Sequence, residues 1–379
     1  MNSELCKRLG IEFPLFAFSH CRDVVAAVST AGGMGIFGAA MMSPEQLEEE
    51  LSWIDAHVKG RPYGVDLIVP NTFEAKGEDI PDAQILAMVP EGHKDFANRV
   101  LQKHGVEPGD LDPIRAKQLI FRENISAEGA RRSLDVAFSH PITLIANALG
   151  LPPPEMLARG KSAGVAVGAL VGTAEHARAQ VAAGVDVIIA AGGEAGGHTG
   201  EISTMVLVPE VVQAIAGSGV PVLAAGGIAT GAQMAAAMAM GAAGAWCGSV
   251  WLTTAEAETS PVVKEKMLAA SSRDTVRSRS RTGKPSRQLV SAWTEAWEDK
   301  SAPKPLPMPL QTLVSEPALH RIDQLSQKGH QGAQDLATYW VGQGVGLMSQ
   351  SMSAGAVVQA FKEDFLTAFE RLQVALGLE

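Results

Sequence analysis

The sequence is poor in cysteine, in tyrosine and in long apolar runs. It has 379 residues with three cysteines (Cys6, Cys21 and Cys247) and two tyrosines, and aromatic residues make up 5% of the chain. The cysteines lack the spacing of metal ligands, so we predict no metal site and a reduced, cytoplasmic protein. No segment resembles a signal peptide, and no uninterrupted apolar run reaches transmembrane length. The formal net charge of -10 argues against a nucleic acid or an acidic membrane as the main partner.

Small residues are plentiful instead: the chain has 39 glycines, and apolar runs alternate with helical patterns. Apolar runs without internal alternation are typical of parallel strands buried on both faces. We predict strands at 14–18, 34–38, 63–69, 142–147, 165–171, 185–191, 221–225 and 245–250. Helices are predicted at 23–31, 43–59 with Ser43 as N-cap, 154–164, 174–184, 209–216, 231–240 and 260–270. This α/β rhythm predicts a (β/α)8 TIM barrel, with a doubly wound open sheet as the rival.

Three segments are expected to be additions to this barrel, which we place at residues 1–270. Residues 70–138 are polar and irregular, and they predict an insertion after the third strand. Residues 271–340 contain an arginine-rich run at 273–287 and a proline-rich run that cannot form regular helix. We predict that they form a cap or lid over one end of the barrel. Residues 341–379 are expected to form helices that pack back on the barrel.

The segment from Gly192 to Gly200 places one histidine, His198, among glycines at the end of the strand predicted at 185–191. A glycine-rich backbone can pass close to a flat or anionic ligand because no Cβ holds the ligand away. A histidine titrates near neutral pH and can accept or donate a proton. The segment therefore indicates a ligand platform with one acid–base group. The alternative is a flexible loop with a surface histidine.

Two shorter glycine motifs follow the last two predicted strands: Ala225-Gly226-Gly227-Ile228 and Cys247-Gly248-Ser249. In TIM barrels, phosphate groups bind at the loops after strands seven and eight, where backbone N–H groups and helix N-termini favour an anion. Ser249 adds a hydroxyl group. Together with the platform, these motifs predict a site for a phosphorylated, flat cofactor.

Residues 190–205, 221–228 and 244–254 resemble the nitronate monooxygenase family, formerly called 2-nitropropane dioxygenases, and its relatives, the flavin-dependent enoyl-acyl-carrier-protein reductases. The resemblance implies an FMN-binding barrel with a lid. It also implies oxidation of nitroalkanes or alkyl nitronates with O2 to a carbonyl compound and nitrite, with His198 as the catalytic base. FMN would carry the redox chemistry, while the protein orients it.

The resemblance further implies which residues line the site. Flavin contacts are expected at Phe18, Ser19, Asp66, Ala191, Gly196, Gly197, Gly226, Gly227, Cys247, Gly248 and Ser249, and substrate contacts at His20 and Asn147. Asp66 stands where the family commonly has asparagine, and its carboxylate could accept a hydrogen bond from the flavin ring. The alternatives are a buried structural acid at Asp66, a small core side chain at Cys247, a loop residue at His20, and no substrate contact at Asn147.

Two other functions fit the same flavin residues. One is an NAD(P)H-dependent flavin reductase of enoyl thioesters or quinones, and the other is a flavin-binding protein without turnover. In a reductase, the arginines at 273–287 could hold a phosphate of NADPH or coenzyme A, or they could form a solvated lid surface. The response of the flavin to NADH and NADPH would separate a reductase from a monooxygenase. A homodimer is compatible with the sequence.

Overall fold

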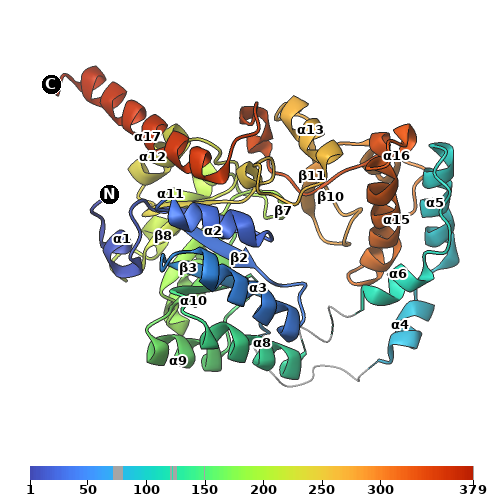
Figure 1. Ribbon diagram of the computed structural model, residues 1–379, viewed down its shortest axis with the longest axis horizontal. Coiled ribbons are helices and arrows are strands. Elements are labelled where there is room, and N and C mark those ends of the chain that lie inside the picture. The colour runs from blue at the N-terminus through green and yellow to red at the C-terminus, as the bar shows by residue number, and fades with distance from the viewer. Residues whose placement is uncertain (71–79, 120–121, 123–125, 149, 379) are drawn as a thin grey trace.

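The fold is built on a closed barrel of parallel strands, which lies on the left in Figure 1. The computed structural model describes residues 1–70, 80–119, 122, 126–148 and 150–378. Around the barrel the strands are β1 (Leu15–Ser19), β2 (Met34–Gly38), β3 (Tyr63–Leu67), β4 (Leu144–Asn147), β5 (Ala166–Val171), β6 (Val187–Ala191), β8 (Val222–Ala225) and β9 (Gly244–Cys247). β9 pairs with β1, with Ala245 opposite Leu15, and this pairing closes the sheet. The predicted TIM barrel is confirmed, and the doubly wound alternative is wrong.

Side chains fill the barrel interior, so a ligand can bind only at one of its ends. The interior cluster includes Phe16, Met34, Ile36 and Trp246. Helix α1 (Glu4–Leu9) contributes three of its apolar residues to the same cluster and so covers the N-terminal end of the strands. The C-terminal end of the strands is therefore the end left for a ligand, as in other barrels of this type.

Helices cover the outside of the barrel. They are α2 (Arg22–Thr30), α3 (Pro44–His57), α8 (Ala127–Ser139), α9 (Pro154–Ala163), α10 (Ala174–Ala183), α11 (Thr204–Ala214), α12 (Gly231–Ala239) and α17 (Ala354–Leu376). Ser43 caps α3 in a complete capping box, as predicted. The helix predicted at 260–270 forms as α13 (Pro261–Ala269), but it packs in the cap described below and not on the barrel. Helix α17 covers the barrel between α12 and α2 instead.

Two predicted boundaries are wrong for identifiable reasons. The last strand does not continue to residue 250, because β9 ends at Cys247 and the chain turns into a 3-10 helix at Ser249–Trp251. The Trp251 indole N–H donates to the Cys247 carbonyl at 2.7 Å and stabilises that turn. Helix α11 begins at Thr204 rather than at Pro209, because the Glu194 carboxylate accepts a hydrogen bond from the Thr204 N–H at 2.8 Å. Proline is common at the first helical position, which made Pro209 a misleading start signal.

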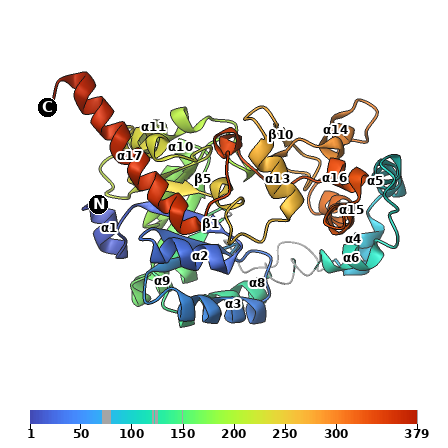
Figure 2. The same ribbon diagram turned by 45° about the horizontal axis from the view of Figure 1, so that its top comes forward.

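A cap stands beside the barrel, and it draws on two distant parts of the chain (Figure 2). One hydrophobic cluster joins residues from the 85–119 region to residues from the 263–348 region. Its helices are α4 (Asp82–Ala87), α5 (Glu91–Lys103), α6 (Asp112–Lys117), α13, α14 (Ala292–Glu298), α15 (Leu310–Ser326) and α16 (Gln331–Leu336). Part of the predicted insertion lies outside the described residues, at 71–79, 120–121 and 123–125. Its last helix, α8, packs against α3 and belongs to the barrel layer.

A small antiparallel sheet connects the cap to the barrel. It contains β10 (Thr275–Ser278), β11 (Ser286–Leu289) and β7 (Gly197–His198), none of which the sequence patterns predicted. Ser286 of β11 lies opposite His198 of β7. Among the described helices, none is long and apolar enough to cross a membrane.

Candidate active site at the C-terminal end of the barrel

Asp66 lies at the end of β3 and is directed into the barrel. Its neighbours Val65 and Leu67 pack in the outer layer, so the alternation of the strand places the carboxyl group on the inner side. The side chain is 3% exposed, and its Oδ1 atom has no hydrogen-bond partner among the described residues. Burial raises the pKa of this carboxyl group well above its ordinary value. Asp66 is thus a buried acceptor at the C-terminal end of the barrel strands.

Hydrogen bonds on several sides hold the glycine platform in place, so it is not a loose loop. The Gly192 N–H donates to the Ala225 carbonyl at 2.9 Å, and the Gly193 N–H donates to the Ile202 carbonyl at 2.7 Å. From the cap, the Arg287 guanidinium donates twice to the Gly193 carbonyl, at 3.1 and 2.9 Å. Gly197 has a φ of +75°, and a Cβ there would meet no atom within 4 Å.

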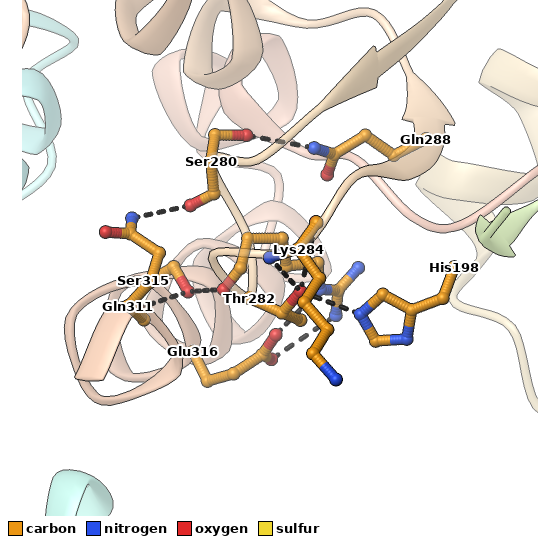
Figure 3. Close-up of polar contacts among 9 residues, drawn as sticks. His198, Ser280, Thr282, Lys284, Gln288, Gln311, Ser315 and Glu316 are labelled. Atoms are coloured by element: carbon orange, nitrogen blue, oxygen red, sulfur yellow. Dashed lines mark hydrogen bonds and ion pairs between the residues drawn. The ribbon is translucent and has the colours of Figure 1, made fainter. Parts of the chain in front are cut away.

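His198 stands at the edge of this platform and faces the cap (Figure 3). Its Nε2 atom lies 2.7 Å from the hydroxyl oxygen of Thr282, and its ring centre lies 6.3 Å from that of Trp340. The residue retains solvent exposure. Partial burial, together with the positive charges of Lys284 and Arg281, lowers its pKa. The imidazole is therefore neutral near pH 7 and able to accept a proton.

The two predicted phosphate motifs lie at the ends of adjacent strands, β8 and β9. Gly226 and Gly227 have φ values of +109° and +71°, a conformation that side chains disfavour. Within the described part of the chain, the backbone N–H groups of Gly226, Gly227 and Gly248 have no hydrogen-bond partner. The Ser249 hydroxyl accepts a hydrogen bond from the Gly342 N–H at 2.8 Å. These N–H groups form a set of donors that suits an anionic group.

The remaining predicted flavin contacts differ in what they present to this end of the barrel. Phe18 stacks on Trp246 with 6.2 Å between ring centres, and Ala191 ends β6 opposite Ala225. The Ser19 hydroxyl accepts from the Cys21 N–H at 3.1 Å and so supports the start of α2. A Cβ on Gly196 would approach the Gly342 nitrogen to 2.8 Å, so Gly196 packs against that segment.

The side chain of Cys247 does not face the site. It is 2% exposed and packs in the outer hydrophobic cluster, and burial raises the pKa of its thiol. Cys247 is therefore a core residue, as the alternative interpretation had it, and only its backbone could contact a ligand.

The two predicted substrate contacts have different environments. His20 lies against the edge of the Phe18 ring, with 5.1 Å between ring centres, and its Nδ1 is 2.6 Å from the Gly38 carbonyl. His20 retains solvent exposure, but the packing around its ring lowers its pKa, and the bond to Gly38 partly offsets this effect. Asn147 is fully buried, and its amide group bonds to both the N–H and the carbonyl of Val69. Asn147 holds the chain after β3 in place, and a substrate contact there stays a prediction.

Two groups of residues at the site escaped the sequence analysis. The segment Gly342–Gly344 crosses the platform: the Gln343 N–H donates to the Glu194 carbonyl at 2.9 Å, and a Cβ on Gly344 would lie 2.7 Å from the Gly227 carbonyl oxygen. The alternating glycines 342, 344 and 346 were the available signal. The second group comes from the cap and includes Thr282. No local sequence pattern indicated that this residue lies at the site.

The site as a whole fits FMN. Among the described residues, it offers backbone N–H donors without a partner at the strand ends for a phosphate, and a buried acceptor without a partner at Asp66 for a ring N–H. A neutral histidine stands on a glycine platform close by. This set of donors and acceptors matches a flat ring system that carries a phosphate group.

Comparison with known proteins agrees with this geometry. The model of the nitronate monooxygenase family matches residues 2–364. The Mycobacterium tuberculosis protein Rv1533, a monooxygenase by name, is 54% identical over 375 residues, which cover 98% of this chain and 99% of that protein. A solved nitroalkane oxidase from Streptomyces ansochromogenes has a TM-score of 0.77 at 26% identity and covers 98% of this chain and 100% of its own. FabK from Thermotoga maritima has a TM-score of 0.70 at 25% identity, with 99% of each chain covered.

Proposed function

Because the chain belongs to the nitronate monooxygenase family, whose members are flavin-dependent oxidoreductases, we propose that it is an FMN-dependent nitronate monooxygenase. It oxidises nitroalkanes or alkyl nitronates with O2 to a carbonyl compound and nitrite. The observation that carries this proposal is the position of His198 on a glycine platform that contacts the end of β8, where N–H donors lack a partner among the described residues. This arrangement suits a proton acceptor placed next to a bound flavin.

In this proposal the chain divides the binding of FMN between two sets of atoms. The backbone N–H groups of Gly226, Gly227 and Gly248 hold the phosphate, and the hydroxyl of Ser249 stands beside them. The Asp66 carboxyl group accepts a hydrogen bond from an N–H of the ring system. When bound, FMN supplies the electron transfer between the organic substrate and O2.

His198 supplies the proton transfer. A neutral nitroalkane must lose a proton from the carbon beside its nitro group to become a nitronate, and a neutral imidazole can accept that proton. The charges of Lys284 and Arg281, which add to the effect of burial in lowering the pKa of the imidazole, also favour a developing anion nearby. A substrate that is already a nitronate does not need this step.

Two experiments test this proposal. Purified protein would be examined for bound flavin, and NADH, NADPH and propyl nitronate would be added separately without oxygen. We expect bleaching of the flavin absorbance by the nitronate and no rapid response to either nicotinamide.

A His198→Asn variant should retain its flavin and its activity on nitronates but lose activity on neutral nitroalkanes. Full activity of this variant on neutral nitroalkanes would refute the assignment of the base.

The likeness to FabK favours one alternative, an NAD(P)H-dependent reductase of enoyl thioesters or quinones. In that case, NADH or NADPH would bleach the flavin rapidly, while the nitronate would have little effect. Such a result would replace the monooxygenase proposal but leave the proposed flavin contacts unchanged.

A further inference from the structure

The geometry points to Thr282 as a positioning residue that holds His198 with its proton on Nε2 and leaves Nδ1 as the proton acceptor. This inference rests on the proposed role of His198 as the base. Thr282 belongs to the cap, 84 residues further along the chain, and its side chain is 4% exposed. Its hydroxyl oxygen lies 2.7 Å from Nε2 of the histidine (Figure 3).

The other contacts of the Thr282 hydroxyl determine the direction of this hydrogen bond. The hydroxyl accepts from the Lys284 N–H at 3.3 Å, and it can donate its own proton to the Lys284 carbonyl at 3.3 Å. If the hydroxyl donated to His198 instead, the contact with that carbonyl would be lost. All three contacts are satisfied together only when His198 Nε2–H donates to Thr282 and Thr282 donates to Lys284.

This arrangement leaves the lone pair of a neutral His198 on Nδ1, which has no hydrogen-bond partner among the described residues. When Nδ1 accepts a proton, Nε2–H continues to donate to Thr282, so the ring is held in the same place in both protonation states. A hydroxyl group carries no charge, so it holds the ring without the rise in pKa that a carboxylate partner would cause.

The loop that carries Thr282 is fixed by buried contacts with α15. The Gln311 amide donates to the Ser280 carbonyl at 2.7 Å, and the Ser315 hydroxyl donates to the Arg281 carbonyl. The Arg281 guanidinium donates to both carboxylate oxygens of Glu316, at 2.7 and 3.3 Å. The hydroxyl of Thr282 is therefore supported from the cap, and the platform that carries His198 is supported from the barrel.

The test compares Thr282→Val, which removes the hydroxyl at nearly constant shape, with Thr282→Ser, which retains it. Thr312→Val is the matched control, because the Thr312 hydroxyl is buried in the same cap without a partner among the described residues. With neutral nitroalkanes we expect kcat of Thr282→Val to fall about 10-fold with little change in KM, as for loss of about one hydrogen bond from the transition state. Thr282→Ser and Thr312→Val should retain most of the wild-type kcat.

A second readout does not depend on turnover. In protein labelled with ¹⁵N-histidine, the ring nitrogen shifts report which nitrogen carries the proton. Wild type and Thr282→Ser should show His198 protonated at Nε2, and Thr282→Val should show a changed tautomer balance or a mobile ring. A wild-type His198 protonated at Nδ1, or unchanged kcat and shifts in Thr282→Val, would overturn the inference. If the wild type fails to oxidise nitronates, the proposed function fails, while the NMR result still decides the hydrogen bond.

Discussion

Replacing Glu316 by glutamine should weaken the cap, because it leaves Arg281 as a buried cation without its counter-charge. Arg281 is 6% exposed, and its guanidinium reaches both carboxylate oxygens of Glu316. Glutamine has nearly the same shape as glutamate and can still accept one hydrogen bond. The substitution therefore removes the charge without opening a cavity, and its effect on stability reports the ion pair itself.

The structure sets the expected size of this effect. Removal of one partner of a buried ion pair costs about 3–5 kcal/mol. The Glu316 side chain keeps 20% of its surface in contact with water, which reduces the value of its charge. Arg281 also stacks on Trp340, with its guanidinium carbon 4.0 Å from the ring centre, and this contact survives the substitution. We therefore expect a loss of about 2–3 kcal/mol in the free energy of unfolding.

Urea unfolding followed by tryptophan fluorescence measures this loss, since Trp293, Trp297 and Trp340 all lie in or beside the cap. Glu91→Gln is the matched control: it breaks an exposed ion pair with Lys94 in the same cap, and it should leave the midpoint unchanged. The same midpoint for Glu316→Gln and wild type would refute the reasoning that this pair secures the loop.

Two further predictions concern the barrel. Burial raises the pKa of Asp66, so the folded state binds the proton of this carboxyl group more tightly than the unfolded chain does. The unfolded chain loses that proton at about pH 4, the ordinary pKa of an aspartate. Flavin-free protein should therefore lose stability as the pH rises above about 4. Asp66→Asn should remove this pH-dependent loss, so the Tm of the variant minus that of wild type should increase with pH. A Tm difference that stays constant from pH 4 to 9 would contradict the argument. Gly231→Ala places a Cβ 2.0 Å from the Phe361 carbonyl oxygen and should cost about 1–3 kcal/mol by separating α12 from α17. Gly92→Ala meets no atom within 4 Å and should gain about 0.5–1 kcal/mol, so equal urea midpoints for the two variants would show the packing argument to be wrong.

Much of the barrel could be predicted because its strands are continuous apolar runs separated by helical patterns. The predicted strand at 34–38 matches β2 residue for residue, and the other predicted strands overlap the observed ones. One error arose where a residue outside the helix decides its start. Glu194 sets the start of α11 through its bond to the Thr204 N–H, and the sequence around Pro209 contains no sign of it.

The residues of the candidate site also differ in whether the sequence could indicate them. The platform around His198, the glycine pair at 226–227 and the single glycine at 248 could be found from the sequence, because local glycine content and position after a strand indicate a ligand site. The environment of Asn147 could not be found in this way. Its position at the end of β4 suggested a substrate contact, and its amide bonds to Val69 in the segment that follows β3. The direction of a side chain at a strand end depends on which face of the sheet it occupies, and a change of one position reverses it.

The sequence by itself determined the barrel, its glycine-rich strand ends and the presence of a histidine among them, because each of these depends on residues close together in the chain. Only the tertiary structure decided that the cap unites the 85–119 region with the 263–348 region and that His198 meets Thr282. It also decided that Asp66 is buried without a partner among the described residues. These features depend on contacts between segments far apart in sequence, and such contacts follow from packing and leave no periodic pattern in either segment.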